Sequence, residues 1–396
     1  MVAPGTGTAA GFAADADRRT VSGLRAAGGL KWSLFPDRIG AFVAESDLGT
    51  APAVRDALRA AVEAERFGYL PPADAEAMGA AYAAWSADRY GWAVAPERVR
   101  PVGDVLSAFR ATVRHLTAPD TPVVLPTPAY MPFLTVPGAL GRRVVEVPLV
   151  PDGDRLVHDL DALGRALAGG GLLVLCNPHN PTGRVLDREE LLGIARVVDA
   201  RGGRVFADEI HAPLVYAGRR HVPYASVDPV AAAHAVTATS ASKAWNVPGL
   251  KCAQVVLTAD ADAERWRAVG EEYEHGASTP GVLANTAAYT HGGAWLDDAL
   301  DYLDGNRRLL GDLLADQLPQ VRYTPPEGTY LAWLDCRGLG LGDHPGEAFA
   351  RAGVAVTDGP ACGRAGAGFA RYTLATPRPV LRETVARLAA GLAPPA

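Results

Sequence analysis

Short apolar strands that alternate with helical segments constrain the fold of this chain most. Residues Leu172–Cys176 read LLVLC, Arg188–Ala200 has helical spacing, and Arg204–Asp208 forms the next strand. Strands that are apolar along their whole length are typical of parallel sheets covered on both faces, and strand, helix and strand in succession indicate a β-α-β unit. Because Ala235–Thr239 and Ala253–Leu257 continue the pattern, the sequence predicts an α/β fold with a large, mostly parallel sheet.

A single lysine stands just after one of these strands. Ser240, Ser242 and Lys243 directly follow Ala235–Thr239, and Lys251 comes eight residues after Lys243. Open α/β sheets bind their ligands at the carboxyl ends of their strands, so the two hydroxyls and the Lys251 amine can face one phosphate. A lysine amine also forms a Schiff base with an aldehyde cofactor. An ordinary surface lysine is the alternative interpretation.

Two further strand ends carry polar side chains. Asn180 lies in a loop with two Asn-Pro turns that follows Leu172–Cys176, and Asp208 ends the next strand, three residues before His211. A buried charge without a partner is costly, so a carboxylate at such a strand end is more often functional than structural. For His211, a structural role remains an alternative.

A glycine stands at the expected start of a helix, in the segment Gly103-Asp104-Val105. Glycine lets backbone N–H groups approach a phosphate there, and the helix dipole favours the negative charge. Asp104 is a common type of N-cap residue, but its charge would oppose a phosphate dianion. We therefore expect its side chain to point away from this site, with only backbone donors in use.

Several of these segments resemble one family. Residues 242–251 read S-K-A-W-N-V-P-G-L-K, residues 126–130 read P-T-P-A-Y, and residues 208–211 read D-E-I-H. They resemble the fold-type I pyridoxal 5'-phosphate (PLP) enzymes of the aminotransferase class I/II superfamily, and most of all the MalY/PatB-type cystathionine β-lyases (C–S lyases). The resemblance runs from about residue 31 to about residue 392, and it implies an aspartate aminotransferase-like fold that binds PLP.

The resemblance also implies roles for individual residues. Lys243 carries PLP and then acts as the base for the α-proton, Asp208 keeps the pyridine nitrogen protonated, and Arg371 binds the α-carboxylate of the substrate. Arg378 is the second choice for that carboxylate. Asp47 lies in a segment similar to the W-V-A-D-M-D-F element of the family, and we expect it at the substrate. The implied catalytic residues are Lys243, Tyr130, Asp208 and His211.

The implied cofactor contacts draw on most of the chain. Tyr130 would stack on the pyridine ring, and Asn180 would hydrogen-bond its phenolic oxygen with His211 nearby. Tyr69 would reach the phosphate of the neighbouring subunit, so the resemblance implies a homodimer with shared active sites. The complete set is Tyr69, Gly103, Asp104, Val105, Tyr130, Asn180, Asp208, His211, Ser240, Ser242, Lys243 and Lys251.

Length and composition set further limits. A chain of 396 residues holds about two domains. We expect a loose N-terminal arm (residues 1–30), a small α+β domain from both chain ends (31–55 and 291–396) and a large PLP-binding domain (56–290). A net charge of −6 without a Lys/Arg-rich run argues against nucleic-acid binding. The four cysteines show no C-x-x-C spacing, which argues against a metal site. No signal peptide or membrane-spanning apolar run is evident, so we expect a cytoplasmic protein.

The expected activity is β-elimination. A C–S β-lyase would convert cystathionine or a cysteine S-conjugate to a thiol, pyruvate and ammonia. An aminotransferase acting on an unusual amino acid is the alternative, because both reactions share their first steps and because Glu45, Ser46, Asp104 and Pro213 depart from the lyase pattern. A regulator that only carries PLP is disfavoured, since Lys243 is present.

Overall fold

A seven-stranded sheet forms the centre of the larger part of the molecule. The computed structural model describes residues 9–392. The strands lie in the order β2 (Val99–Val102), β10 (Ala253–Leu257), β9 (Ala235–Thr239), β8 (Arg204–Asp208), β7 (Leu172–Cys176), β3 (Val123–Thr127) and β4 (Val144–Pro148). Neighbouring strands from β9 to β4 are parallel, whereas β10 runs antiparallel to both of its neighbours, β2 and β9. The predicted mostly parallel sheet is therefore confirmed.

Helices cover both faces of this sheet, as fully apolar strands require. Leu173 of β7 belongs to one core cluster with Ile194 of α9 (Arg188–Ala200), whereas Val174 belongs to another with Phe109 of α6 (Val105–His115). Successive side chains of a strand point to opposite faces, so the two clusters are the two sides of one sheet. The other helices of this part are α4 (Pro52–Glu63), α5 (Pro72–Tyr90), α7 (Pro132–Ala139), α8 (Leu160–Ala166), α10 (Pro229–His234), α11 (Asp260–Glu274) and α12 (Thr279–His291).

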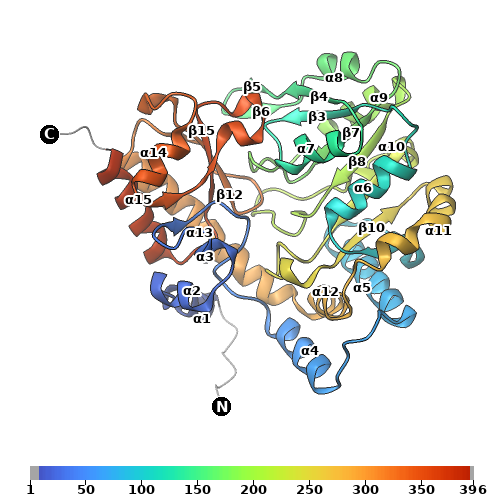
Figure 1. Ribbon diagram of the computed structural model, residues 1–396, viewed down its shortest axis with the longest axis horizontal. Coiled ribbons are helices and arrows are strands. Elements are labelled where there is room, and N and C mark those ends of the chain that lie inside the picture. The colour runs from blue at the N-terminus through green and yellow to red at the C-terminus, as the bar shows by residue number, and fades with distance from the viewer. Residues whose placement is uncertain (1–8, 393–396) are drawn as a thin grey trace.

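The two ends of the chain lie together beside this sheet, as the blue and red segments of Figure 1 show. An antiparallel sheet there has the order β11 (Arg322–Tyr323), β12 (Leu331–Asp335), β15 (Phe369–Thr373) and β14 (Thr357–Asp358). The N-terminal strand β1 (Ile39–Gly40) pairs in parallel with β13 (Val354–Ala355). The helices of this part are α3 (Leu30–Ser33), α13 (Gly293–Gln317), α14 (Pro345–Arg351) and α15 (Arg378–Leu392). The exact domain boundaries stay a prediction.

The N-terminal segment differs from the loose arm that we expected. Residues 1–8 lie outside the described residues, but α1 (Ala9–Asp17) and α2 (Val21–Ala27) are regular helices. The Phe12 ring packs against Trp295 and Tyr302 of α13, with ring centroids 5.6 and 5.9 Å apart. The Tyr302 hydroxyl also donates a hydrogen bond to the Asp17 carboxylate. This aromatic packing offsets the conformational entropy of ordering the segment.

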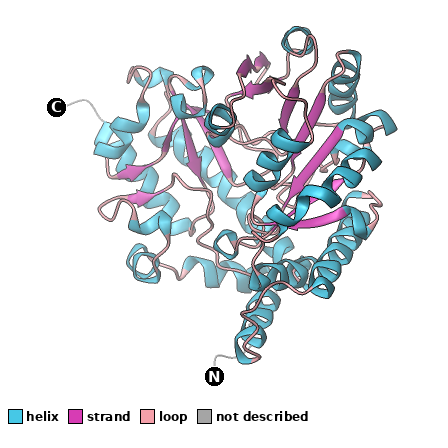
Figure 2. Cartoon of the chain, turned by 45° about the vertical axis from the view of Figure 1, so that its right-hand side comes forward, coloured by secondary structure: helices cyan, strands magenta, loops and turns pink. Residues whose placement is uncertain are grey.

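Two local expectations also need correction. The spacing of residues 156–168 predicts a helix, but Arg155–Val157 forms β6 of a hairpin with β5 (Val150–Asp152). Asp159 then caps α8, which begins at Leu160. The alternation of residues 326–335 predicts a half-buried strand, but strand β12 is buried along residues 331–334. Its Trp333 stacks on the Phe369 ring at 5.2 Å. Figure 2 shows the two sheets among their surrounding helices. No helix between residues 9 and 392 is long and apolar enough to cross a membrane.

Candidate active site

The candidate residues gather at the carboxyl ends of three adjacent strands. Cys176, the last residue of β7, lies opposite Asp208 of β8, and Asp208 lies opposite Ala238 of β9. The loops that follow these strands therefore leave the sheet at the same edge. This register brings Asp208, at the end of β8, together with Asn180 and Lys243 from the loops after β7 and β9, as expected for a ligand site in an α/β sheet.

Lys243 lies in a turn just after β9, with its amine held by another part of the chain. Its Nζ donates a hydrogen bond to the carbonyl oxygen of Ala44, at 2.9 Å. Burial lowers the pKa of Lys243 to about 8, and the charge of Arg371 acts in the same direction, while Glu45 and Asp208 oppose it. A lysine with a lowered pKa has more of the neutral, nucleophilic amine near neutral pH.

Asp208 is a buried carboxylate without a cation bound to it. Its Oδ1 accepts a hydrogen bond from the backbone N–H of Ile210 at 3.1 Å, and the Cys176 thiol lies 3.9 Å from Oδ2. Burial raises the pKa of Asp208 to about 6. Among residues 9–392 no side chain forms an ion pair with it. A protonated ring nitrogen would supply the missing positive charge.

Arg371 of β15 belongs to the smaller sheet and brings a positive charge into the site, opposite to that of Asp208. It is 2% exposed. Nη1 donates to Asn180 Oδ1 at 3.1 Å, and Nη2 donates to the Phe42 carbonyl at 2.7 Å and to Thr357 Oγ1 at 3.0 Å. Burial lowers the pKa of Arg371. No carboxylate neutralises this guanidinium in the described part of the chain, which suits it to an anionic guest.

His211 and Tyr330 complete the surroundings of the lysine. Their rings meet edge to face with centroids 6.1 Å apart. The Tyr330 hydroxyl donates to the same Ala44 carbonyl that binds Lys243, at 3.0 Å. Burial and the nearby cations lower the pKa of His211 well below its usual range, and its Nδ1 is buried without a hydrogen-bond partner. His211 is therefore neutral and can still bond to a ligand.

The sequence pattern does not predict the contact of Tyr330 with the Ala44 carbonyl. The preceding Thr329 has a φ of 64°, which is unusual for a β-branched residue. Its hydroxyl accepts a hydrogen bond from Leu331 N at 2.8 Å, and its carbonyl accepts one from the Tyr216 hydroxyl at 2.6 Å. These bonds hold a conformation that the sequence alone does not reveal.

The expected phosphate end has one feature that differs from the prediction. Asp104 does cap α6: its Oδ1 accepts hydrogen bonds from the backbone and the hydroxyl of Ser107, both at 2.8 Å. Its Oδ2, however, forms an ion pair with Lys251 at 3.2 Å. The side chain thus reaches the cation that we expected to bind phosphate, and our expectation that it points away is corrected. No side chain fits at Gly103, where a Cβ would lie 2.7 Å from the Gly276 carbonyl oxygen.

The other predicted cofactor contacts lie at different depths. Ser240 Oγ donates to the Cys252 carbonyl at 2.7 Å and accepts from Ser242 N at 3.0 Å. Tyr130 is partly buried and its ring meets Phe133 edge to face. Val105 is the first residue of α6 and is buried. Tyr69, in contrast, is 96% exposed, and its ring meets His275, which is not one of the predicted cofactor contacts.

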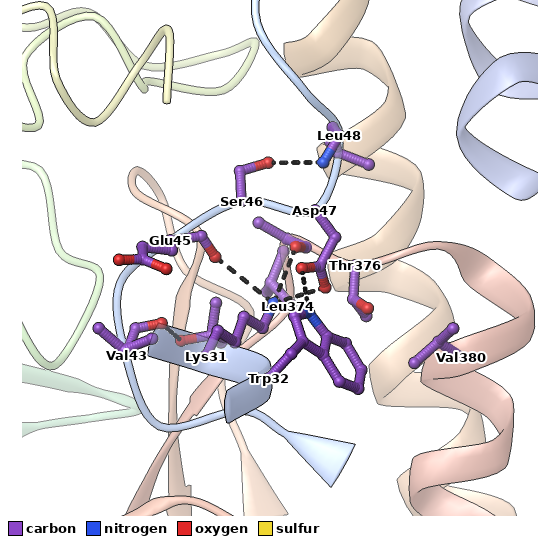
Figure 3. A network of polar contacts seen from close by, with 12 residues as sticks. Lys31, Trp32, Val43, Glu45, Ser46, Asp47, Leu48, Leu374, Thr376 and Val380 are labelled. Carbon is purple, nitrogen blue, oxygen red and sulfur yellow. Dashed lines mark hydrogen bonds and ion pairs between the residues drawn. The ribbon is translucent and has the colours of Figure 1, made fainter. Parts of the chain in front are cut away.

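Asp47 pairs with neighbouring side chains of the protein and does not make the predicted substrate contact. Its Oδ2 pairs with Lys31 Nζ and its Oδ1 accepts a hydrogen bond from the Trp32 indole, both at 2.7 Å (Figure 3). Both carboxylate oxygens are engaged and the residue is buried. We therefore replace the predicted substrate-binding role of Asp47 by a structural one, in which it anchors its own loop. The guanidinium of Arg378, the second choice for the substrate carboxylate, lies over the Tyr302 ring at 4.3 Å.

The assembled groups fit PLP with an amino acid. Lys243 offers a reactive amine. Within the described part of the chain, Asp208 has no cation bound to it, Arg371 has no anion, and His211 Nδ1 has no hydrogen-bond partner. An aldehyde cofactor with a basic ring nitrogen would satisfy the first two, and a substrate carboxylate would satisfy the third. The fold and this site define a class of protein: a PLP-dependent enzyme with the fold-type I architecture.

Comparison with known proteins places the chain within that class. The model of the family Aminotransferase class I and II matches residues 39–388, and the chain belongs to this family. The cystathionine β-lyase of Corynebacterium glutamicum is 38% identical over 374 residues, covering 92% of this chain and 96% of the relative. The cystathionine β-lyase PatB of Bacillus subtilis is 30% identical over 361 residues, covering 90% and 93%. The predicted resemblance is thus confirmed.

A solved structure agrees with the same placement. The crystal structure of a proposed PLP-dependent β-cystathionase from Corynebacterium diphtheriae superimposes with a TM-score of 0.88 at 36% identity, covering 94% of this chain and 98% of that one. The aspartate aminotransferase-like fold and the PLP cofactor predicted from the sequence are confirmed.

Proposed function

We propose that this protein is a PLP-dependent C–S β-lyase that cleaves L-cystathionine and related cysteine S-conjugates. The observation that carries the proposal is the convergence of Lys243, Asp208 and Arg371 at one edge of the sheet. Similarity to cystathionine β-lyases along more than nine-tenths of the chain supports the choice of reaction.

Each of these residues has a distinct task in the proposed reaction. PLP, when bound, supplies a ring that accepts electrons from the substrate's α-carbon. The Arg371 guanidinium binds the α-carboxylate by two parallel hydrogen bonds. Asp208 holds a proton at the pyridine nitrogen through its negative charge. The Lys243 amine, positioned by the Ala44 carbonyl, takes the α-proton as a general base.

The proposed overall reaction consumes one water. The Cβ–S bond breaks, its electron pair leaves with sulfur, and the thiolate takes up a proton. The remaining three-carbon unit is hydrolysed to pyruvate and ammonia. From L-cystathionine the thiol is homocysteine. No oxidant or amino-group acceptor is needed, and this separates the reaction from transamination.

We also propose that two copies of the chain share their active sites. Tyr69 is almost fully exposed, and its ring lies 6.4 Å from that of His275 beside a pocket of about 600 Å³. An exposed aromatic ring at a pocket suits a subunit interface. In such a homodimer Tyr69 of one copy would reach the phosphate site of the other.

One turnover experiment tests the proposed reaction. Purified protein with PLP receives L-cystathionine without any keto acid, and pyruvate and free thiol are measured. The proposal predicts steady release of both, and none from the Lys243→Ala variant. If product appears only after a keto acid is added, and an amino group moves to that acid, the protein is an aminotransferase.

A further inference from the structure

One carboxylate at the site has no task in the proposed mechanism. Glu45 follows Ala44, whose carbonyl oxygen binds both Lys243 Nζ and the Tyr330 hydroxyl. Burial is the main cause of the shifts at both groups; the charge of Glu45 adds to the raised pKa of Tyr330 and opposes the lowered pKa of Lys243. Glu45 therefore lies within electrostatic range of the reacting amine.

No cation among the described residues forms an ion pair with this carboxylate. Lys31 directs its ammonium to Asp47 Oδ2 at 2.7 Å and to the backbone carbonyls of Glu45 and Ala375 at 3.4 and 3.2 Å. Figure 3 shows the Glu45 side chain on the other side of its loop, pointing away from Lys31 and Trp32. Between residues 9 and 392 no side chain forms a hydrogen bond or an ion pair with the Glu45 carboxylate.

The Glu45 carboxylate lies next to a residue without a side chain. Oε2 lies 3.9 Å from the point that a Cβ would occupy on Gly29. Glu45 itself is half-buried. A half-buried carboxylate forms stronger hydrogen bonds to a cation than one in bulk water does, because the local dielectric constant is lower.

The other charged residues of the site already have partners on the cofactor or the substrate. Arg371 is assigned to the α-carboxylate and Asp208 to the cofactor nitrogen, while the α-amino group meets the cofactor. Only the leaving group of the substrate then remains to meet Glu45. We propose that Glu45 binds a positive charge on the leaving thiol, so that the enzyme prefers L-cysteine S-conjugates whose thiol carries an ammonium group.

This inference rests on the proposed lyase function and narrows its substrate class. The homocysteine half of L-cystathionine carries such an ammonium group, whereas simple S-alkylcysteines do not. The inference also gives a reason for the glutamate at position 45, where the aspartate of the resembling family element would have a shorter reach.

Two substrates of nearly equal shape test the inference. S-(2-aminoethyl)-L-cysteine and S-propyl-L-cysteine differ by an ammonium in place of a methyl group. We expect kcat/KM for pyruvate release to favour the aminoethyl conjugate by about tenfold or more, as for a hydrogen bond to a charged group. In Glu45→Gln this ratio should fall close to one. Because both substrates are compared within one enzyme, any general effect on Lys243 cancels.

Two further variants serve as controls. Glu45→Asp keeps the charge with a shorter side chain, and it should keep part of the preference. Glu63→Gln removes one negative charge at an exposed position of α4, and its ratio should equal that of the unaltered protein. A ratio near one in the unaltered protein, or one that Glu45→Gln leaves unchanged, would overturn the inference.

Failure of the proposed function gives a different result. If neither conjugate yields pyruvate, the lyase proposal fails. The charge preference is then measured as the concentration of each conjugate that half-saturates the absorbance change of bound PLP. Equal concentrations for the two conjugates would overturn the role of Glu45 as well, whereas a preference lost in Glu45→Gln would preserve it.

Discussion

Replacing Asp47 by asparagine distinguishes a structural carboxylate from a substrate ligand. The side chains of Lys31 and Asp47 are 1% and 4% exposed, and Nζ lies 2.7 Å from Oδ2. Asp47→Asn keeps an oxygen for the Trp32 indole but removes the counter-charge of a buried ammonium. Removing one partner of a buried ion pair typically costs about 3–5 kcal/mol of folding free energy, because the other charge stays uncompensated.

The structure places the expected loss at the lower end of that range. Lys31 keeps two carbonyl acceptors, Glu45 O at 3.4 Å and Ala375 O at 3.2 Å, and these partly stabilise its charge. We therefore expect Asp47→Asn to lower the free energy of unfolding by about 3 kcal/mol, measured by urea denaturation. The double variant Lys31→Met with Asp47→Asn should lose less than the sum of the single variants, because it leaves no buried charge.

A matched substitution and a kinetic measurement complete this test. Asp56 pairs with Arg59 on the surface, where the side chains are 67% and 68% exposed, so Asp56→Asn should change stability little. Folded Asp47→Asn protein should keep a KM for L-cystathionine close to that of the unaltered protein. An unfolding free energy within about 1 kcal/mol of the unaltered protein, together with a strongly raised KM, would refute the structural assignment.

Three further predictions follow from the site. Asp104→Asn keeps a capping oxygen for α6 but removes a negative charge that opposes the phosphate and pairs with Lys251. The dissociation constant of PLP should therefore fall roughly tenfold. A fluorescence titration of the apoprotein that shows equal or weaker PLP binding would contradict this prediction. Mixing Lys243→Ala with Tyr69→Phe subunits should restore about a quarter of full activity, because each mixed dimer has one complete site; no recovery after confirmed subunit exchange would rule out shared sites. Burial lowers the pKa of Lys243 to about 8. Because only the neutral amine attacks PLP, the rate of Schiff-base formation with the apoprotein should rise with pH and level off above about pH 8. A midpoint of this rise near pH 10 would mean that Lys243 has the pKa of an ordinary lysine.

The large sheet and the residues at its edge could be predicted because each signal is local. Asn180 and Lys243 each follow a buried strand within a few residues, and Asp208 is the last residue of another. Parallel strands bring their carboxyl ends together whatever the details of packing. The N-terminal helices were missed because their stability comes from distant aromatic partners: Phe12 packs on Trp295 and Tyr302. Composition alone does not reveal such contacts.

The part of the site that comes from the smaller sheet was harder to predict. The Lys243 amine binds the Ala44 carbonyl across 199 positions of sequence, and Arg371 binds the Phe42 carbonyl across 329. Backbone carbonyls leave no trace in a residue pattern. The direction of a loop side chain is equally hidden, and for this reason Asp47 was assigned to the substrate although it faces Lys31.

The most direct test of the account is the stoichiometry of products from L-cystathionine in the absence of any keto acid. We expect pyruvate, ammonia and homocysteine in equal amounts over many turnovers, with an absorbance band of bound PLP at ~420 nm that is absent in Lys243→Ala. Conversion of that band to the pyridoxamine form after a single turnover, with no pyruvate until a keto acid is added, would contradict the account.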